Sequence, residues 1–281
     1  PDVEARKKIL SVHSLSKPLS ETVDLRFWAS RTAGFSGADL ENLMNESAIH
    51  CARDNSSEIS NKHIEDALEK ITLGLRSISL SSNRTKKLRA YNEVGRAIVS
   101  AVKNGRDSVD KITILPRAGY LGGYTKIAPD EEVITSGLIS KKLLLSKIEV
   151  ALAGRAAEIV VFGKSEITQC AMNDLLYSTE IAKEMVTRYG FSVMGPVSIN
   201  QQSDQIFLGN SLLKNKSNIA DKTSTKIDKE IMKISKTSLD NSIAILKKNR
   251  VLLDKLVDVI VYEETIDNKR FNEISSGLLN V

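Results

Sequence analysis

Apolar residues recur at helical spacing along most of the chain, which predicts a mainly helical fold. The clearest signal is a capping box formed by Ser36 and Asp39, followed by an apolar face within residues 40–48. A further amphipathic helix is predicted to end at Gly74, because glycine is the usual residue just beyond a helix. Residues 1 to about 75 are therefore predicted to form a compact bundle of small helices.

A second, larger unit is predicted to follow a polar, Ser-rich linker at 75–83. The β-branched and aromatic residues near 111–127 favour two short strands, with a turn at Pro116 and Gly119. The close spacing of Gly154 with two following alanines predicts that a neighbouring element packs tightly there. Helical patterning predicts helices over 88–104, 143–162, 173–190, 220–249 and 251–262.

Composition supports this interpretation and excludes several classes of protein. Aromatic residues make up only 5% of the 281 residues and charged residues 27%, which favours helix over strand. No apolar run has the length that a membrane crossing needs, and the first residues lack a signal-peptide core. The 40 basic and 35 acidic residues leave a charge of +5 that is spread out, so no nucleic-acid partner is expected.

Cysteine and histidine are scarce. Cys51 and Cys170 belong to no CxxC pair, which excludes a disulfide scaffold and a cysteine zinc finger. The three histidines are His13, His50 and His63, so residues 64–281 contain none. No side chain of the second unit can therefore supply an imidazole ligand.

A series of motifs occurs in the order found in the FtsH family. They are PDVEARKKILSVH, GFSGADLENLMNESAI, YNEVGRAI, ILPRAGYLGG, LAGRAAEIVVFG, MNDL and YEETI. The chain resembles the C-terminal part of an FtsH-type ATP-dependent zinc metalloprotease over nearly its whole length. The resemblance implies a helical AAA+ lid subdomain at 1–78, followed by a mainly helical peptidase domain with a small β-sheet at 79–281.

The resemblance also implies nucleotide contacts in the lid. By analogy with the family, His13, Gly37 and Ala38 lie at the positions that approach the adenine and ribose of ATP. A Gly-Ala pair lets a nucleotide approach the backbone, and an imidazole can pack or hydrogen-bond against a purine. The alternative is a surface histidine and a good helix start. No GxxxxGK[ST] loop occurs, so this chain alone is expected not to hydrolyse ATP.

The family's zinc motif is altered in this sequence. HExxH places two histidine ligands on one helix face and a Glu that activates the bound water. The residues at those positions are Asn92, Glu93, Val94, Gly95 and Arg96, and the third family ligand corresponds to Asp174. Arginine is a permanent cation and binds no metal. We therefore expect no bound zinc, and we interpret Glu93 as a vestigial general base.

Two further hypotheses concern the altered motif. Cys170, four residues before Asp174, either offers a substitute thiolate or is a small buried apolar residue, and the second alternative is favoured. Arg96 is expected to pair with Asp174 or Glu93, so that a guanidinium replaces the charge of the metal.

Three functions remain open. The first is a proteolytically inactive subunit that serves ring assembly, unfolding or substrate handling. The second is an active zinc metalloendopeptidase with an unusual or partner-completed site, and the third is a non-catalytic oligomerisation module. The family implies a homo- or hetero-hexamer, polypeptide substrates and ATP. It also implies a location at a plastid membrane (thylakoid or envelope) or at the bacterial inner membrane, in preference to a mitochondrial membrane. The start at Pro1, within a helical pattern, leads us to expect a missing N-terminal segment that carries the membrane anchor.

Overall fold

The computed structural model describes residues 1–74, 83–105, 108–116, 123–128, 133, 136–199 and 220–280. Helices dominate these residues and one small sheet accompanies them, which confirms the predicted fold class. The chain divides into two compact units. The first comprises 1–90, 107–139 and 259–271, and the second comprises 91–106, 140–258 and 272–281. The predicted linker falls largely outside the described residues.

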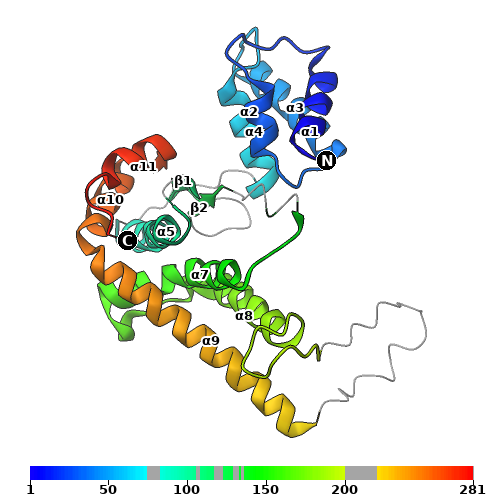
Figure 1. Cartoon of the computed structure of the whole chain (residues 1–281). Helices are drawn as coiled ribbons and strands as arrows, with labels where there is room; N and C mark the ends of the chain where they lie inside the picture. Colours follow the sequence, from blue (N-terminus) through cyan, green and yellow to red (C-terminus); the bar gives the residue numbers. More distant parts are fainter. Residues whose placement is uncertain are drawn as a thin grey trace. The chain divides into compact units, whose positions relative to one another are not determined.

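The first unit begins with a bundle of small helices, as predicted (Figure 1). These helices are α1 (Val3–Ser14), α2 (Leu25–Arg31), α3 (Gly37–Arg53) and α4 (Asn61–Leu73). Their apolar faces enclose a core of fully buried side chains that includes Leu10, Trp28, Leu43 and Ile64. Both hydrogen bonds of the predicted capping box at Ser36 are present. The bundle therefore has an apolar core of its own.

The rest of the first unit contains a three-stranded antiparallel sheet. Its strands are β1 (Val109–Thr113), β2 (Tyr124–Ile127) and β3 (Thr265–Asp267), in the order β2-β1-β3. The first two strands are the predicted ones, although most of the predicted turn lies outside the described residues. β3, which follows β2 by well over a hundred residues, was not predicted. It pairs with β1 at Thr113 and Thr265, whose hydroxyls lie 2.8 Å apart.

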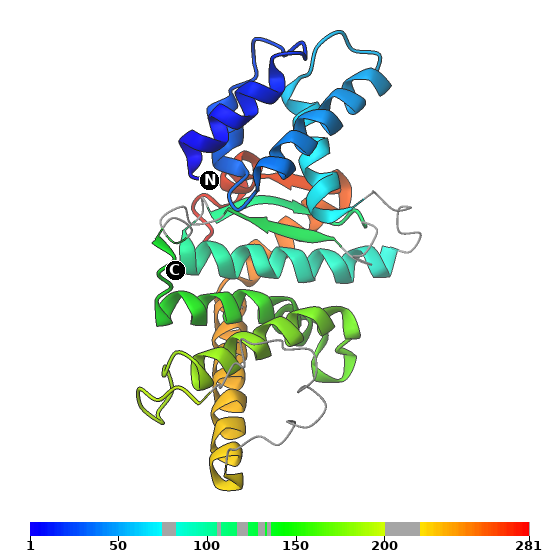
Figure 2. The same cartoon turned by 90° about the vertical axis from the view of Figure 1, so that its right-hand side faces the viewer.

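The second unit is built from helices, which are α5 (Asn83–Asn104), α7 (Lys141–Phe162), α8 (Met172–Thr187), α9 (Asp221–Lys248), α10 (Arg250–Glu263) and α11 (Asn268–Ser275). Three of them, α5, α10 and α11, begin or end in the first unit. The predicted helices are confirmed, and α11 is an addition. α7 is buried along most of its length, and the long α9 runs across both α7 and α8 (Figure 2). Among the described residues, no helix has the length and apolar character to cross a membrane.

Small residues bring α5 and α7 close together. A Cβ atom added at Gly95 would lie 2.9 Å from the Cβ of Ala157 and 3.1 Å from the carbonyl oxygen of Ala153. A Cβ added at Gly154 would lie 2.9 Å from the Oδ1 of Asn92. All three distances are shorter than ordinary contacts, so the predicted tight packing around Gly154 is confirmed. This packing places the altered motif of α5 against α7.

Candidate active site on α5, α7 and α8

The altered motif lies on the buried side of α5. Asn92 and Arg96 are one helical turn apart and share a face, and Glu93 lies beside them. Asn92 and Glu93 are almost fully buried, whereas about a fifth of the Arg96 side chain is exposed. The helix therefore presents these three side chains together, as HExxH would present its own.

Arg96 forms ion pairs with two carboxylates. Its Nη1 lies 3.3 Å from the Oε2 of Glu93, and its Nη2 lies 2.5 Å from the Oδ2 of Asp174. Asp174 belongs to the first turn of α8, where the helix dipole favours a negative charge. The predicted pairing is confirmed, and it includes both acids rather than one of them.

The environment of Asp174 shifts the pKa of its carboxyl group. Burial raises the pKa of Asp174 above the ordinary value of 3.8, and the Arg96 guanidinium lowers it only in part. Removing a carboxylate from water disfavours its charged form, which explains the direction. Asp174 thus depends on Arg96 for the stability of its charge.

Asn92 is hydrogen-bonded to a buried acid, Glu158, that the sequence did not predict as part of the site. The side-chain Nδ2 of Asn92 donates to the Oε1 of Glu158, at 2.9 Å, and Glu158 is fully buried on α7. Thr168 donates to the same carboxylate through its backbone N–H, at 2.7 Å, and through its hydroxyl, at 2.8 Å. The available signal was a single charged residue inside the apolar run AAEIVV. Charged residues are rarely buried unless they are paired.

The carbonyl oxygen of the Asn92 side chain faces the surface of α7 at Gly154. Among the described residues no hydrogen-bond partner reaches this buried Oδ1 atom. The donor end of the amide thus serves Glu158, while the acceptor end lies against a glycine. A Cβ atom added at Gly154 would also lie 3.5 Å from the Nε of Arg96, so glycine leaves room for both side chains.

The favoured interpretation of Cys170 is wrong. Its thiol is free and exposed, not buried. Cys170 also belongs to the short 3₁₀ helix Gln169–Ala171, whereas Asp174 lies in α8, so the two do not share one helix face. Within the described residues, no group of three or more His, Cys, Asp or Glu side chains could hold a metal ion.

The candidate nucleotide residues lie on two helices of the bundle that pack against each other. His13 is half-buried in the last turn of α1, and Gly37 and Ala38 are exposed at the start of α3. Nothing lies within 4 Å of a Cβ atom added at Gly37, so local packing does not require glycine there. Their role in nucleotide binding stays a prediction.

Comparison with known families agrees with this architecture. The model of peptidase family M41 matches residues 79–274, and that of the AAA+ lid domain matches residues 22–66. The fold is thus that of an AAA+ lid joined to a peptidase-type domain. The chain belongs to peptidase family M41 and corresponds to the C-terminal part of FtsH proteins.

Several relatives are similar over almost the whole chain. The ATP-dependent zinc metalloprotease FtsH 3 of Synechocystis is 40% identical over 98% of this chain and 44% of its own length. FtsH of Thermotoga maritima is 39% identical over 98% of this chain and 45% of its own. The chloroplastic FTSH 8 of Arabidopsis thaliana is 38% identical over 100% of this chain and 40% of its own. The chain therefore spans less than half the length of these curated relatives.

Proposed function

We propose that this chain is the C-terminal part of an FtsH-like subunit that has lost its peptidase activity. The observation that carries the proposal is the Arg96 guanidinium, which is paired with both Glu93 and Asp174. In the family's arrangement these two acids would serve the bound water and the metal. Here both are neutralised by a side chain instead.

The residues present do not fit a zinc ion. A catalytic zinc needs three protein ligands, commonly including histidine, and a fourth open position. Asn92 uses its amide nitrogen on Glu158 and offers only a weak oxygen ligand, while Arg96 is a permanent cation that repels a metal. Asp174 alone keeps ligand character, and it is already paired. No metal-dependent step is therefore assigned to this chain.

The proposed subunit keeps the family's roles other than proteolysis. We place an AAA+ lid at 1–78 and a peptidase-type domain at 79–281, within a homo- or hetero-hexamer that handles polypeptide substrates. His13, Gly37 and Ala38 are the proposed contacts to the base and ribose of ATP, and this sequence contains no GxxxxGK[ST] loop for the phosphates. The chloroplastic and cyanobacterial relatives support a plastid or bacterial inner membrane as the location.

Restoring the missing ligands tests the loss of zinc. The double variant Asn92→His with Arg96→His rebuilds HExxH and removes the competing cation. We expect elemental analysis to find no tightly held zinc in the original chain and about one zinc per chain in the double variant. The matched control, Asn92→His alone, keeps the guanidinium and is expected to bind none.

The active-enzyme alternative predicts a different outcome. One zinc per original chain, together with casein degradation that a chelator and Glu93→Gln both abolish, would overturn the proposal. The double variant could bind zinc and still degrade no more casein than the original chain. That result would leave the proposed loss of activity in place, because the original chain would still lack both metal and activity.

A further inference from the structure

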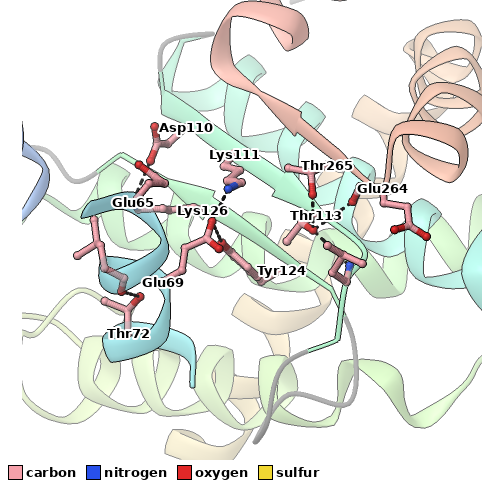
Figure 3. Close-up of polar contacts among 12 residues, drawn as sticks. Glu65, Glu69, Thr72, Asp110, Lys111, Thr113, Tyr124, Lys126, Glu264 and Thr265 are labelled. Atoms are coloured by element: carbon pink, nitrogen blue, oxygen red, sulfur yellow. Dashed lines mark hydrogen bonds and ion pairs between the residues drawn. The ribbon is translucent and has the colours of Figure 1, made fainter. Parts of the chain in front are cut away.

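Charged side chains connect the lid helices to the β-sheet within the first unit. Glu69 of α4 is almost fully buried, and its Oε1 accepts hydrogen bonds from the ammonium group of Lys111 and from the hydroxyl of Tyr124, the latter at 3.1 Å. Lys111 lies on β1 and Tyr124 on β2. Figure 3 shows Glu69 pointing from α4 toward these two side chains. A single carboxylate of the lid thus accepts hydrogen bonds from side chains of both strands.

A second set of contacts lies one helical turn away on α4. The Nη1 of Arg31, on α2, lies 2.9 Å from the Oε2 of Glu65, on α4, and the same guanidinium also pairs with Asp110 on β1. Asp110 in turn lies 3.1 Å from the Nζ of Lys126 on β2. Arg31 and its three charged neighbours have side chains only about a fifth exposed, so water screens these pairs less than surface pairs.

The lid does not depend on the sheet for its apolar core. The buried cluster around Trp28 and Leu43 is built from residues of the lid alone. The lid can therefore separate from the sheet without exposing that core to water, at the cost of breaking ion pairs and hydrogen bonds. Polar interfaces of this kind are typical of parts that move relative to each other.

We propose that Arg31, Glu65 and Glu69 of the lid, with Asp110, Lys111 and Tyr124 of the sheet, form a releasable latch between the AAA+ lid and the peptidase-type domain. The latch fixes the position of the lid on β1 and β2, and it opens while the lid stays folded. This inference rests on the contacts themselves and stands whether or not the zinc position is active. In a nucleotide-driven cycle, the latch would transmit lid movement to the sheet.

The only tryptophan of the chain makes the latch measurable. Trp28 is buried in the lid core, its Nε1 donates to Asn61 at 2.8 Å, and the Arg31 guanidinium lies 5.5 Å from its ring centroid. Trp28 fluorescence therefore reports the unfolding of the lid, and far-ultraviolet circular dichroism reports the helices of the whole chain. Lys111→Met changes the sheet side alone and leaves the lid sequence intact.

The matched control is Lys86→Met. Lys86 is as exposed as Lys111 and also pairs with a glutamate, Glu264, at 2.6 Å, but neither residue belongs to the lid helices. We expect Lys111→Met to lower the midpoint of the Trp28 thermal transition by about 5 °C or more, with the lid still folded at 25 °C. Lys86→Met should leave that midpoint unchanged.

A double-mutant cycle tests the pair directly. Glu69→Met combined with Lys111→Met removes both charges, so the combined shift should be smaller than the sum of the single shifts. Equal shifts for Lys86→Met and Lys111→Met, no shift for Lys111→Met, or additive shifts in the cycle would each overturn the latch. A lid that is unfolded at 25 °C while circular dichroism shows the other helices to be folded would overturn it as well. If Lys111→Met fails to fold, Asp110→Asn, which keeps the shape of the side chain, is measured in the same way.

Discussion

At the scale of single residues, one arginine changes the chemistry of the altered motif. Arg96 supplies a fixed positive charge where two acids converge, and its planar guanidinium can pair with both at once. A metal ion would also balance these charges, but it would leave an open coordination position for water. The guanidinium offers no such position, so the proposed loss of activity follows from a charge that is balanced without a Lewis acid.

Removing Arg96 should therefore destabilise the fold. We expect Arg96→Ala to lower the free energy of unfolding by about 2 to 4 kcal/mol, slightly less than the roughly 3 to 5 kcal/mol typical of a fully buried pair. Urea unfolding measures the change. The control is Arg188→Ala, because Arg188 forms a largely exposed pair with Glu184 that should contribute about 0.5 kcal/mol or less. Equal losses for the two variants would argue against a structural role for Arg96.

The same substitution should also change the titration of Asp174. Because burial already raises its pKa above 3.8, the folded protein keeps the proton to higher pH than the unfolded chain. The contribution of Asp174 to stability is thus greatest below pH 3.8 and is lost as pH rises through the folded pKa. Without Arg96 that pKa should rise further, which a carboxyl carbon NMR titration detects. An unchanged pKa would contradict the pairing.

At the scale of secondary structure, local patterns located most helices and the first two strands. The capping box at Ser36 and Gly74 after α4 are local signals, and the structure confirms them. β3 could not be found in the same way, because its partner β1 lies far away in sequence and its three residues carry no pattern of their own. The bond between Asn92 and Glu158 is equally non-local, whereas the pairing of Arg96 followed from charge and the family motif.

The close packing of α5 on α7 makes a sharp prediction about Gly95. Gly95→Ala would place a Cβ atom 2.9 Å from Ala157 and 3.1 Å from a backbone oxygen, and backbone cannot move aside cheaply. We expect overpacking to cost about 1 to 3 kcal/mol, which outweighs the roughly 0.5 to 1 kcal/mol that alanine gains over glycine within a helix.

Gly37→Ala is the matched control, since a Cβ atom there meets nothing within 4 Å. It should leave thermal stability unchanged or raise it slightly. A Gly95→Ala protein as stable as Gly37→Ala would show that the α5 and α7 backbones lie farther apart than the structure places them.

At the scale of the whole molecule, the proposed nucleotide contacts and the altered motif belong to different parts of the chain. The lid carries the proposed base and ribose contacts, but the sequence contains no GxxxxGK[ST] loop to hold phosphates and their metal. The peptidase-type domain keeps the family fold and the position of the general base without the family's histidines. Each part thus retains the scaffold of its family, while this sequence contains neither a GxxxxGK[ST] loop nor an HExxH motif.

This division predicts how the chain responds to nucleotide fragments. Adenosine added to the 281-residue chain should shift the NMR signals of His13, Gly37 and Ala38, with about millimolar affinity because no phosphate contacts contribute. Inorganic triphosphate should leave these signals unchanged, since the phosphate loop is absent from the sequence. His50, on the same lid but outside the proposed contacts, provides the internal control. Equal adenosine shifts at His50 would mean that the nucleoside binds the lid unspecifically, and triphosphate shifts at Gly37 would mean that the lid binds anions at its surface.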